Sequence, residues 1–399
     1  MPEPRFLQIH FLAPYTAALL NRDDAGLAKR LPYGNALRTR VSSQCLKRHW
    51  RLADDPNRPG GGDPHGLHRI DGATLATRSR DLVDDRIIEP MRGPIDDGVL
   101  GALQTWFNYA VYGGNETKKP TKLGAKVATD EKAQRQTLLL GEPELIWLAE
   151  QATVLARDAA GDAQKAFDLA KDWHADFKKN IHALREATRL PAGLTGALFG
   201  RMVTSDPKAN IDAPVHVAHA FTVHAEEAES DYFIAADDLA REEDTGADTI
   251  QETELTSGLF YGYVVVDLPG LLRNLAGDAE LAGAVLHNLV HLIAEVSPGA
   301  KLGSTAPYSR AVLMLLEAGD RQPRSLAEAF RTPCAPETGQ AVASLADYLG
   351  RLDTAYATGE DRRVMSLANT PLPGAEPGTL ADLAGFAQGL PGRLAANAA

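Results

Sequence analysis

The chain has 399 residues and a formal net charge of −12, with 44% hydrophobic and 24% charged residues and a mean hydropathy of −0.22. This acidity excludes a general nucleic-acid coat, so any contact with an anionic polymer must be local. No apolar run approaches the length of a membrane span, and two cysteines are too few for a disulfide framework. We therefore expect a protein of the reducing cytoplasm that has no membrane partner.

Residues 5–12 predict the first strand, because Gln8 and His10 alternate with bulky apolar residues. We expect this strand to be half-buried. A long basic loop, a short strand and a capped helix follow, an order that suits the first half of a ferredoxin-like or RNA-recognition-type sheet. Such sheets bind single strands through aromatic residues on the sheet face, but the common RNA-recognition signature is absent here, so the fold would be a divergent one.

Residues 20–51, here called the basic segment, carry positive charge within an acidic chain. Eight basic residues face two acids, Asp23 and Asp24, which leaves a local charge of +6. The basic residues are Arg22, Lys29, Arg30, Arg38, Arg40, Lys47, Arg48 and Arg51. Such an excess points to an anionic ligand, and the alternative is a solvated basic surface.

A helix is predicted inside the basic segment. Residues 39–41 are typical of a strand end, Ser42 and Ser43 are candidate N-caps, and residues 44–51 are helical in pattern. One face of that helix would present Gln44, Lys47, Arg48 and Arg51. Together with the unsatisfied N–H groups of the helix start, this face could hold several phosphates of one strand.

Residues 54–66 are a loop by composition and the best candidate for a domain boundary. A helical region extends from there to about residue 190. Within it, residues 118–132 form a basic loop, and solvation is a commoner role for such a loop than contact with nucleic acid.

Residues 214–224 alternate and predict a strand back in the sheet domain, with Val215 and Phe221 on one side. Three histidines in this strand suggest a metal. However, His216 and His224 share a face from which His219 is excluded, and no cysteine or carboxylate lies at ligand spacing. We therefore interpret them as polar-face histidines and expect no metal.

Residues 226–254, here called the acidic segment, contain twelve acids against the single Arg241, a local charge of −11. Tyr232 and Phe233 lie in the middle of the segment. The pattern predicts a solvated acidic excursion that carries an apolar tip, and its charge argues against wrapping phosphates.

A strong strand follows at residues 259–266, and residues 281–296 predict an amphipathic helix. His287 and His291 are four residues apart on this helix, but no glutamate follows the first histidine as in zinc proteases, so packing or exposure is the better interpretation. No phosphate-binding loop, dinucleotide-binding glycine pattern or nucleophile elbow is present. We expect no cofactor.

Several motifs, taken in order, resemble one family: the CasC-type backbone subunits of the type I-E CRISPR surveillance complex (Cascade). The resemblance covers most of the chain apart from about residues 55–165. The matching residues are 21–24, 40–44, 46–48, 200–205, 217–224, 237–238, 257–261 and 298–301. One such motif would be weak, whereas this ordered series is specific.

The resemblance implies an α+β fold with an RRM- or ferredoxin-like sheet domain (palm), an inserted helical lobe (fingers) and a β-hairpin excursion (thumb). The palm would comprise residues 1–54, 191–225 and 258–399, the fingers residues 55–190, and the thumb residues 226–257. Family members polymerise along the guide RNA, so the implied partners are CRISPR guide RNA, further copies of the chain in a helical filament, other Cascade subunits, and target DNA reached through the guide.

The function implied is non-catalytic RNA binding in antiviral defence. Arg22, Lys29, Gln44, Lys47, Arg48 and Arg51 would hold phosphates or riboses, and Ser42 and Ser43 would cap the helix or bond to the RNA backbone. By resemblance, Met202, Tyr232 and Phe233 would shape a kink in the strand by wedging between bases, and Lys301 would add charge.

A metal-dependent ribonuclease is the alternative function. Relatives in other CRISPR types cut RNA with an acid near this position, and the adjacent Asp23 and Asp24 could hold Mg²⁺. Adjacent residues rarely chelate one ion well, however, and these acids could instead order their loop. In the type I-E pattern they are not catalytic.

Overall fold

The computed structural model describes residues 4–55, 61–113, 117–124, 127–203, 206–234 and 250–398. It divides into two compact units, each described here by itself. The first unit comprises Met1–Ile70, Val215–Pro269 and Ala279–Ala399, and the second comprises Asp71–Pro214 and Gly270–Asp278. Within the described ranges, no helix has the length and apolar character needed to cross a membrane. The domain borders inferred from the sequence stay predictions.

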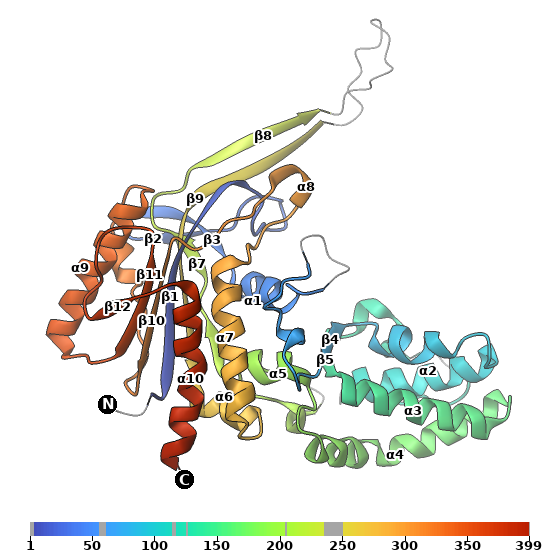
Figure 1. The fold of residues 1–399 in the computed structure, drawn as a ribbon. Coiled ribbons are helices and arrows are strands. Elements are labelled where there is room, and N and C mark those ends of the chain that lie inside the picture. Colours follow the sequence, from blue (N-terminus) through green and yellow to red (C-terminus); the bar gives the residue numbers. More distant parts are fainter. Residues whose placement is uncertain are drawn as a thin grey trace, which may run out of the picture. The chain divides into compact units, whose positions relative to one another are not determined.

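A large, mostly antiparallel sheet forms the first unit (Figure 1), which confirms the α+β class. Its strand order is β12 (Ala375–Pro377), β11 (Asp361–Ser366), β10 (Leu313–Gly319), β1 (Phe6–Ala18), β9 (Ile250–Asp267), β7 (Ala220–Thr222), β3 (Ala36–Val41) and β2 (Arg30–Tyr33). Two more strands, β6 (Val215–Val217) and β8 (Ala228–Ile234), pair with β9. Only the β12–β11 pair among these described strands is parallel.

Strand β1 lies at the centre of this sheet, antiparallel to both β9 and β10. The prediction of a half-buried strand was wrong, because Gln8 and His10 are as buried as Leu7 and Ile9, at 2% and 0% exposure. Both faces of β1 are covered, and its polar side chains find hydrogen-bond partners inside the protein.

Helices cover the two faces of the sheet. On one face, α9 (Thr338–Tyr356) and the short helix η7 (Ala327–Phe330) pack on apolar residues of β1, β7, β9 and β10. On the other, α7 (Ala279–Glu295) and α10 (Leu380–Ala398) lie side by side (Figure 1), and α1 (Ser43–Arg51) contacts α7. The short helices α6 (Leu268–Asn274), α8 (Leu302–Thr305) and η1 (Leu67–Arg69) complete the connections.

The stretch predicted as one alternating strand is two short strands, β6 and β7. Their registers on β9 differ by one residue, since Val217 pairs with Val264 while Phe221 pairs with Tyr261. This irregularity breaks the alternation, so His219 is exposed at the break whereas His224 is buried at 3% exposure. The interpretation of His224 as a polar-face residue was therefore wrong, and its Nε2 instead accepts a hydrogen bond from the backbone N–H of Leu259.

The second unit is a helical lobe, as the pattern between residues 66 and 190 predicts. Helices α2 (Asp97–Tyr112), α3 (Glu142–Ala159) and α4 (Ala163–Ala187) share one apolar core with a two-stranded sheet of β4 (Ala76–Ser79) and β5 (Leu138–Gly141). Helix α5 (Gly193–Phe199) follows, and the short turns are η2 (Asp84–Ile88), η3 (Glu89–Met91), η4 (Ala128–Asp130), η5 (Lys132–Gln134) and η6 (Pro207–Ala209).

A charged network lies between the sheet of the first unit and the segment that precedes η7. The Glu317 carboxylate accepts hydrogen bonds from both Arg324 and Arg362 at 2.7–2.8 Å, and from the His10 ring at 2.9 Å. The other ring nitrogen of His10 lies 2.9 Å from the Tyr261 hydroxyl, and Arg362 continues to Asp353. Burial alone would raise the pKa of Glu317, but the hydrogen bonds from His10 and Arg324 hold it far below its usual range.

We predict that Glu317→Gln lowers the free energy of unfolding by about 3–5 kcal/mol, because the buried guanidinium of Arg362 and the half-buried one of Arg324 lose their shared counter-ion. Chemical denaturation measures the loss. Asp347→Asn is the matched control, since Asp347 pairs with Arg351 on the exposed side of α9 and such pairs contribute about 0.5 kcal/mol. A Glu317→Gln loss no larger than that of the control would contradict the role of the network.

The difference in stability between wild type and Glu317→Gln should depend on pH. Because the folded-state pKa of Glu317 is depressed, its stabilisation is complete above the unfolded value of about 4.3 and is lost as the pH falls below it. The difference between wild type and Glu317→Gln should therefore shrink as the pH drops below about 4.

Candidate nucleic-acid interface

Helix α1 is built as the sequence predicts. The Ser42 hydroxyl accepts the backbone N–H of Cys45 at 3.3 Å and so caps the helix. Leu46 and Trp50 are buried on the inner face. The opposite face carries Gln44, Lys47, Arg48 and Arg51, of which Gln44 and Arg48 are exposed and the other two half-buried. The capping hydroxyl of Ser42 is engaged within the chain, whereas Ser43 remains partly exposed beside Gln44.

The loop before β2 is fixed to the start of α1. The Asn21 side chain accepts the backbone N–H of Ser42 at 3.0 Å, and the Lys29 N–H donates to the Asn21 carbonyl at 3.0 Å. At the tip of this loop, one carboxylate oxygen of Asp23 accepts the N–H groups of Ala25 and Leu27 at 2.9 and 3.0 Å. Asp23 therefore orders the loop through these backbone amides. Arg22 and Asp24 are exposed at its surface.

A segment distant in sequence joins this region. Ala300 forms an isolated β-bridge with Leu19, and its N–H donates to the Leu19 carbonyl at 2.7 Å. The bridge brings Lys301, which is exposed, to the end of β1 where the basic segment begins. The predicted site residues Arg22, Lys29, Gln44, Lys47, Arg48, Arg51 and Lys301 thus belong to one region of the first unit.

Arg38 does not contribute to the surface, although it counts toward the +6 of the basic segment. Its guanidinium is buried at 0% exposure. It donates to backbone carbonyls in β2, at the end of β7 and at the end of η7, among them Thr222 and Phe330 at 2.9 Å. This arginine supplies hydrogen bonds to backbone carbonyls that would otherwise lack partners. Because it is buried, the exposed positive charge of the basic segment is smaller than the sequence count indicates.

Arg30 is neutralised by the acidic segment. Its guanidinium pairs with both Glu226 and Glu254, which flank the β8–β9 hairpin at its base. The hydrogen bonds and charges of these acids raise the pKa of Arg30. Two of the twelve acids are thus used inside the chain, and they attach the hairpin to the basic segment.

His219 is a residue of this region that the sequence pattern did not identify. Arg40 lies 2.9 Å from its Nδ1 atom. Burial lowers the pKa of His219, and the positive charges of Arg40 and Lys29 lower it further. The ring is therefore neutral at pH 7 and adds a hydrogen-bonding group beside the cations. The irregularity between β6 and β7 exposes it, and alternation alone does not reveal such a break.

The predicted wedge residues lie on the hairpin. Strand β8 contains Tyr232 and Phe233, paired in register with Glu252 and Gln251 of β9, and the two strands extend beyond the rest of the first unit's sheet (Figure 1). The side chains of Tyr232 and Phe233, together with residues 235–249, lie outside what the structure describes. Met202 is 72% exposed in the second unit, so the structure does not relate it to the hairpin.

One group of side chains in the first unit has the composition of a metal site: His65, His291 and Glu295. The sequence places His291 on a helix without a zinc-protease pattern, and nothing local connects it with His65, which precedes it by more than 200 positions. Only the folded chain brings the two rings together.

Three comparisons with known proteins bear on this geometry. The model of a family described as "CT1975-like protein" matches residues 7–385. A solved chain of a "CRISPR RNA-guided surveillance complex, pre-nicking" is 24% identical with a TM-score of 0.73, and the alignment covers 96% of this chain and 100% of that one. A chain of another "CRISPR RNA-guided surveillance complex" is 23% identical with a TM-score of 0.65, covering 96% and 99%. No curated protein matches.

We predict that replacing either of two arginines of the basic segment changes the stability of the protein by very different amounts. Arg38→Met should lower the free energy of unfolding by about 3 kcal/mol or more, because several buried carbonyls lose a charged donor. Arg48→Met should change it by no more than about 0.5 kcal/mol, since the side chain is exposed. Urea denaturation of both variants tests this, and similar losses would show that Arg38 is not the internal anchor.

Proposed function

Because the chain belongs to the CT1975-like protein family, we propose that it is a non-catalytic RNA-binding backbone subunit of a CRISPR surveillance complex (Cascade). The observation that carries this proposal is the basic face of α1, where Arg48 is exposed and Lys47 and Arg51 are half-buried, with exposed Arg22 and Lys301 in the same region of a chain whose net charge is −12. The matched solved chains come from RNA-guided complexes, which supports guide RNA as the anion.

The arrangement of the first unit supports the palm interpretation. In chain order, β1, α1, β7, β9, α7 and β10 alternate as strand, helix, two strands, helix and strand, and the four strands lie in the order β10-β1-β9-β7. A ferredoxin-like domain has this same pattern. The helical second unit then corresponds to the fingers, and the β8–β9 hairpin to the thumb.

RNA would bind along an edge of this palm rather than on its face. Tyr261 and Phe221, which would be candidates for stacking bases on the sheet, are buried beneath η7 and α9. The typical RNA-recognition mode is therefore closed to this sheet. The exposed cations lie at the strand ends and on α1 instead, where they can hold phosphates of a single strand without reading its bases.

Assembly would complete the function. Copies would associate head to tail through a heterologous interface, which stays open-ended unless other subunits cap it. The thumb of one copy would reach over its neighbour, and Tyr232, Phe233 and Met202 would kink the guide so that it pairs with target DNA in segments. The Arg30 pair with Glu226 and Glu254 supports this division of roles, because it fixes the hairpin base beside the cationic face.

We predict that Lys47→Ala with Arg51→Ala weakens retention of single-stranded RNA by about tenfold at moderate salt, because charged hydrogen bonds to phosphates are lost. The slope of log K against log salt should decrease in magnitude by about 1.4 for two lost contacts. Filter binding across a salt series measures both quantities, and scrambled guides should behave like the natural one.

The matched control is Arg321→Ala with Arg351→Ala, which changes the net charge equally at exposed positions elsewhere in the first unit. Equal weakening by the control would show that bulk charge, not this face, retains RNA. The same preparation tests catalysis: the RNA should stay intact in Mg²⁺. Cutting that stops with EDTA and in an Asp23→Ala/Asp24→Ala chain would establish the nuclease instead.

We predict a different outcome for Tyr232→Ala with Phe233→Ala. This pair should leave the affinity for bare RNA within about twofold of wild type, because neither residue is charged. It should instead disturb the repeat spacing of assembled copies or the pairing of target DNA, which electron microscopy and a target-binding assay measure. If it weakens binding of bare RNA as much as Lys47→Ala/Arg51→Ala does, phosphate binding and kinking of the guide are not separate roles of these two pairs.

A further inference from the structure

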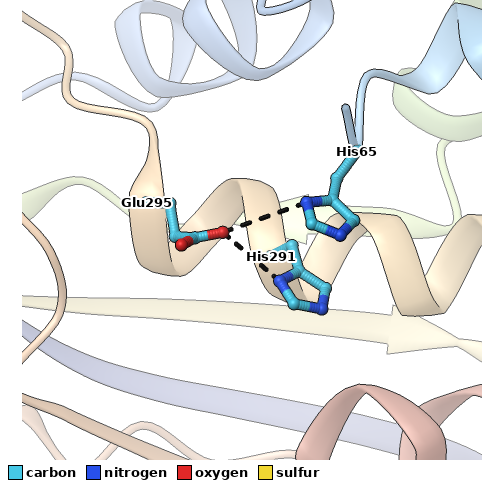
Figure 2. Close-up of side chains that lie close together, drawn as sticks. All are labelled: His65, His291 and Glu295. Atoms are coloured by element: carbon cyan, nitrogen blue, oxygen red, sulfur yellow. Dashed lines mark hydrogen bonds and ion pairs between the residues drawn. The ribbon is translucent and has the colours of Figure 1, made fainter. Parts of the chain in front are cut away.

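Helix α7 carries two histidines and a glutamate along one stripe. His287, His291 and Glu295 follow at intervals of four residues, so they lie on the same face of the helix. His65, from the loop after α1, packs against this stripe: its ring stacks on that of His291 with centroids 3.7 Å apart and planes within 4° (Figure 2).

Two of the ring nitrogens point at one oxygen. The Nδ1 of His291 is 3.3 Å from Oε2 of Glu295, and the Nδ1 of His65 is 3.9 Å from the same atom (Figure 2). All three potential ligand atoms lie within 4.8 Å of one another. Ligands of one tetrahedral ion at bond lengths of 2.0–2.1 Å are separated by about 3.3 Å. The two stacked rings would tilt out of their parallel arrangement to place one ion in both ring planes, and this rotation would bring the three atoms onto it.

The His65 nitrogen is otherwise without a partner among the described residues. Its Nδ1 is covered from solvent and makes no hydrogen bond, and Oδ1 of Asp63 is 3.8 Å away. A buried polar atom in this condition costs free energy unless a ligand satisfies it. The second carboxylate oxygen of Glu295 faces Arg310 at 3.3 Å, which leaves Oε2 for the ligand.

We propose that His65, His291 and Glu295 form a binding site for one Zn²⁺ ion. Two imidazoles and a carboxylate are a donor set that Zn²⁺ commonly takes, with a fourth position for water or for the Asp63 carboxylate. The ion would tie the loop at residues 61–66 to α7. The ion has an entry route, because neighbouring cavities share Asp63, Glu295 and Tyr308 in their walls.

Such a site would lie close to the end of α1, the helix that carries the proposed RNA-binding face. The cavity beside it is also lined by His49 and Leu52, at the end of α1. An ion at Glu295 would therefore hold residues 61–66 against α7 beside the end of α1. The proposal itself does not depend on RNA binding, since it rests on the three side chains alone.

The test is Zn²⁺ binding to the full chain without an affinity tag, measured by isothermal titration calorimetry. We expect one ion per chain with a dissociation constant of about 10 μM or tighter, and a rise in the thermal midpoint that EDTA reverses. His65→Ala, His291→Ala and Glu295→Gln should each weaken binding at least about tenfold. His65→Ala is the decisive variant, because His65 lies on a surface loop and removal of its side chain should not unfold the protein.

Two controls separate this site from adventitious binding. His287→Ala removes the other histidine of the same helix stripe, and His216→Ala removes an exposed histidine elsewhere in the first unit. Both should bind Zn²⁺ as wild type does. The proposal is overturned if wild type shows no saturable binding of one ion, or if His65→Ala binds as tightly as His287→Ala.

Discussion

Burial of both faces of the large sheet is the constraint on which the first unit depends. Strand β1 is covered from α7 and α10 on one side and from η7 and α9 on the other, and the polar residues of that second side are satisfied by a network centred on Glu317. The central strands of a sheet covered in this way offer no face to a ligand. Whatever the protein binds must lie at strand ends, on helix surfaces or on the projecting hairpin, and the exposed cations lie in those places.

The local sequence pattern was sufficient to predict most of the helices and strands. The strand at residues 5–12, the cap at Ser42, the helical insert and the helix at residues 281–296 follow from periodicity and capping, which depend on neighbours in sequence. What the sequence could not supply is long-range. The burial of Gln8 and His10 depends on residues more than 300 positions away, such as Glu317 and Arg324. The register change between β6 and β7 depends on their pairing with β9, and the stacking of His65 on His291 depends on the whole fold.

The arginines of the basic segment show how far charge counting can be trusted. Arg38 and Arg48 are ten positions apart and identical in chemistry, yet Arg38 binds backbone carbonyls in the interior and Arg48 is exposed on α1. Arg30, on β2, is paired with two acids. Their side-chain environments differ because alternation in β3 turns Arg38 inward, while the amphipathic pattern of α1 turns Arg48 outward. A charge sum over the segment therefore gives an upper bound on the charge available to a ligand.

The Arg30 pairing also links the two oppositely charged segments. Glu226 lies just before β8 and Glu254 lies on β9, and one guanidinium bridges them. The Ala28 N–H donates to Glu254 as well, at 3.3 Å, so the loop that presents Arg22 and Lys29 is attached to the same point. A hairpin held in this way cannot swing freely against the loop without breaking a partly buried ion pair. The two ends of the acidic segment, at Glu226 and Glu254, are therefore joined to the basic segment through Arg30, and the base of the hairpin is held by residues that flank the cationic face.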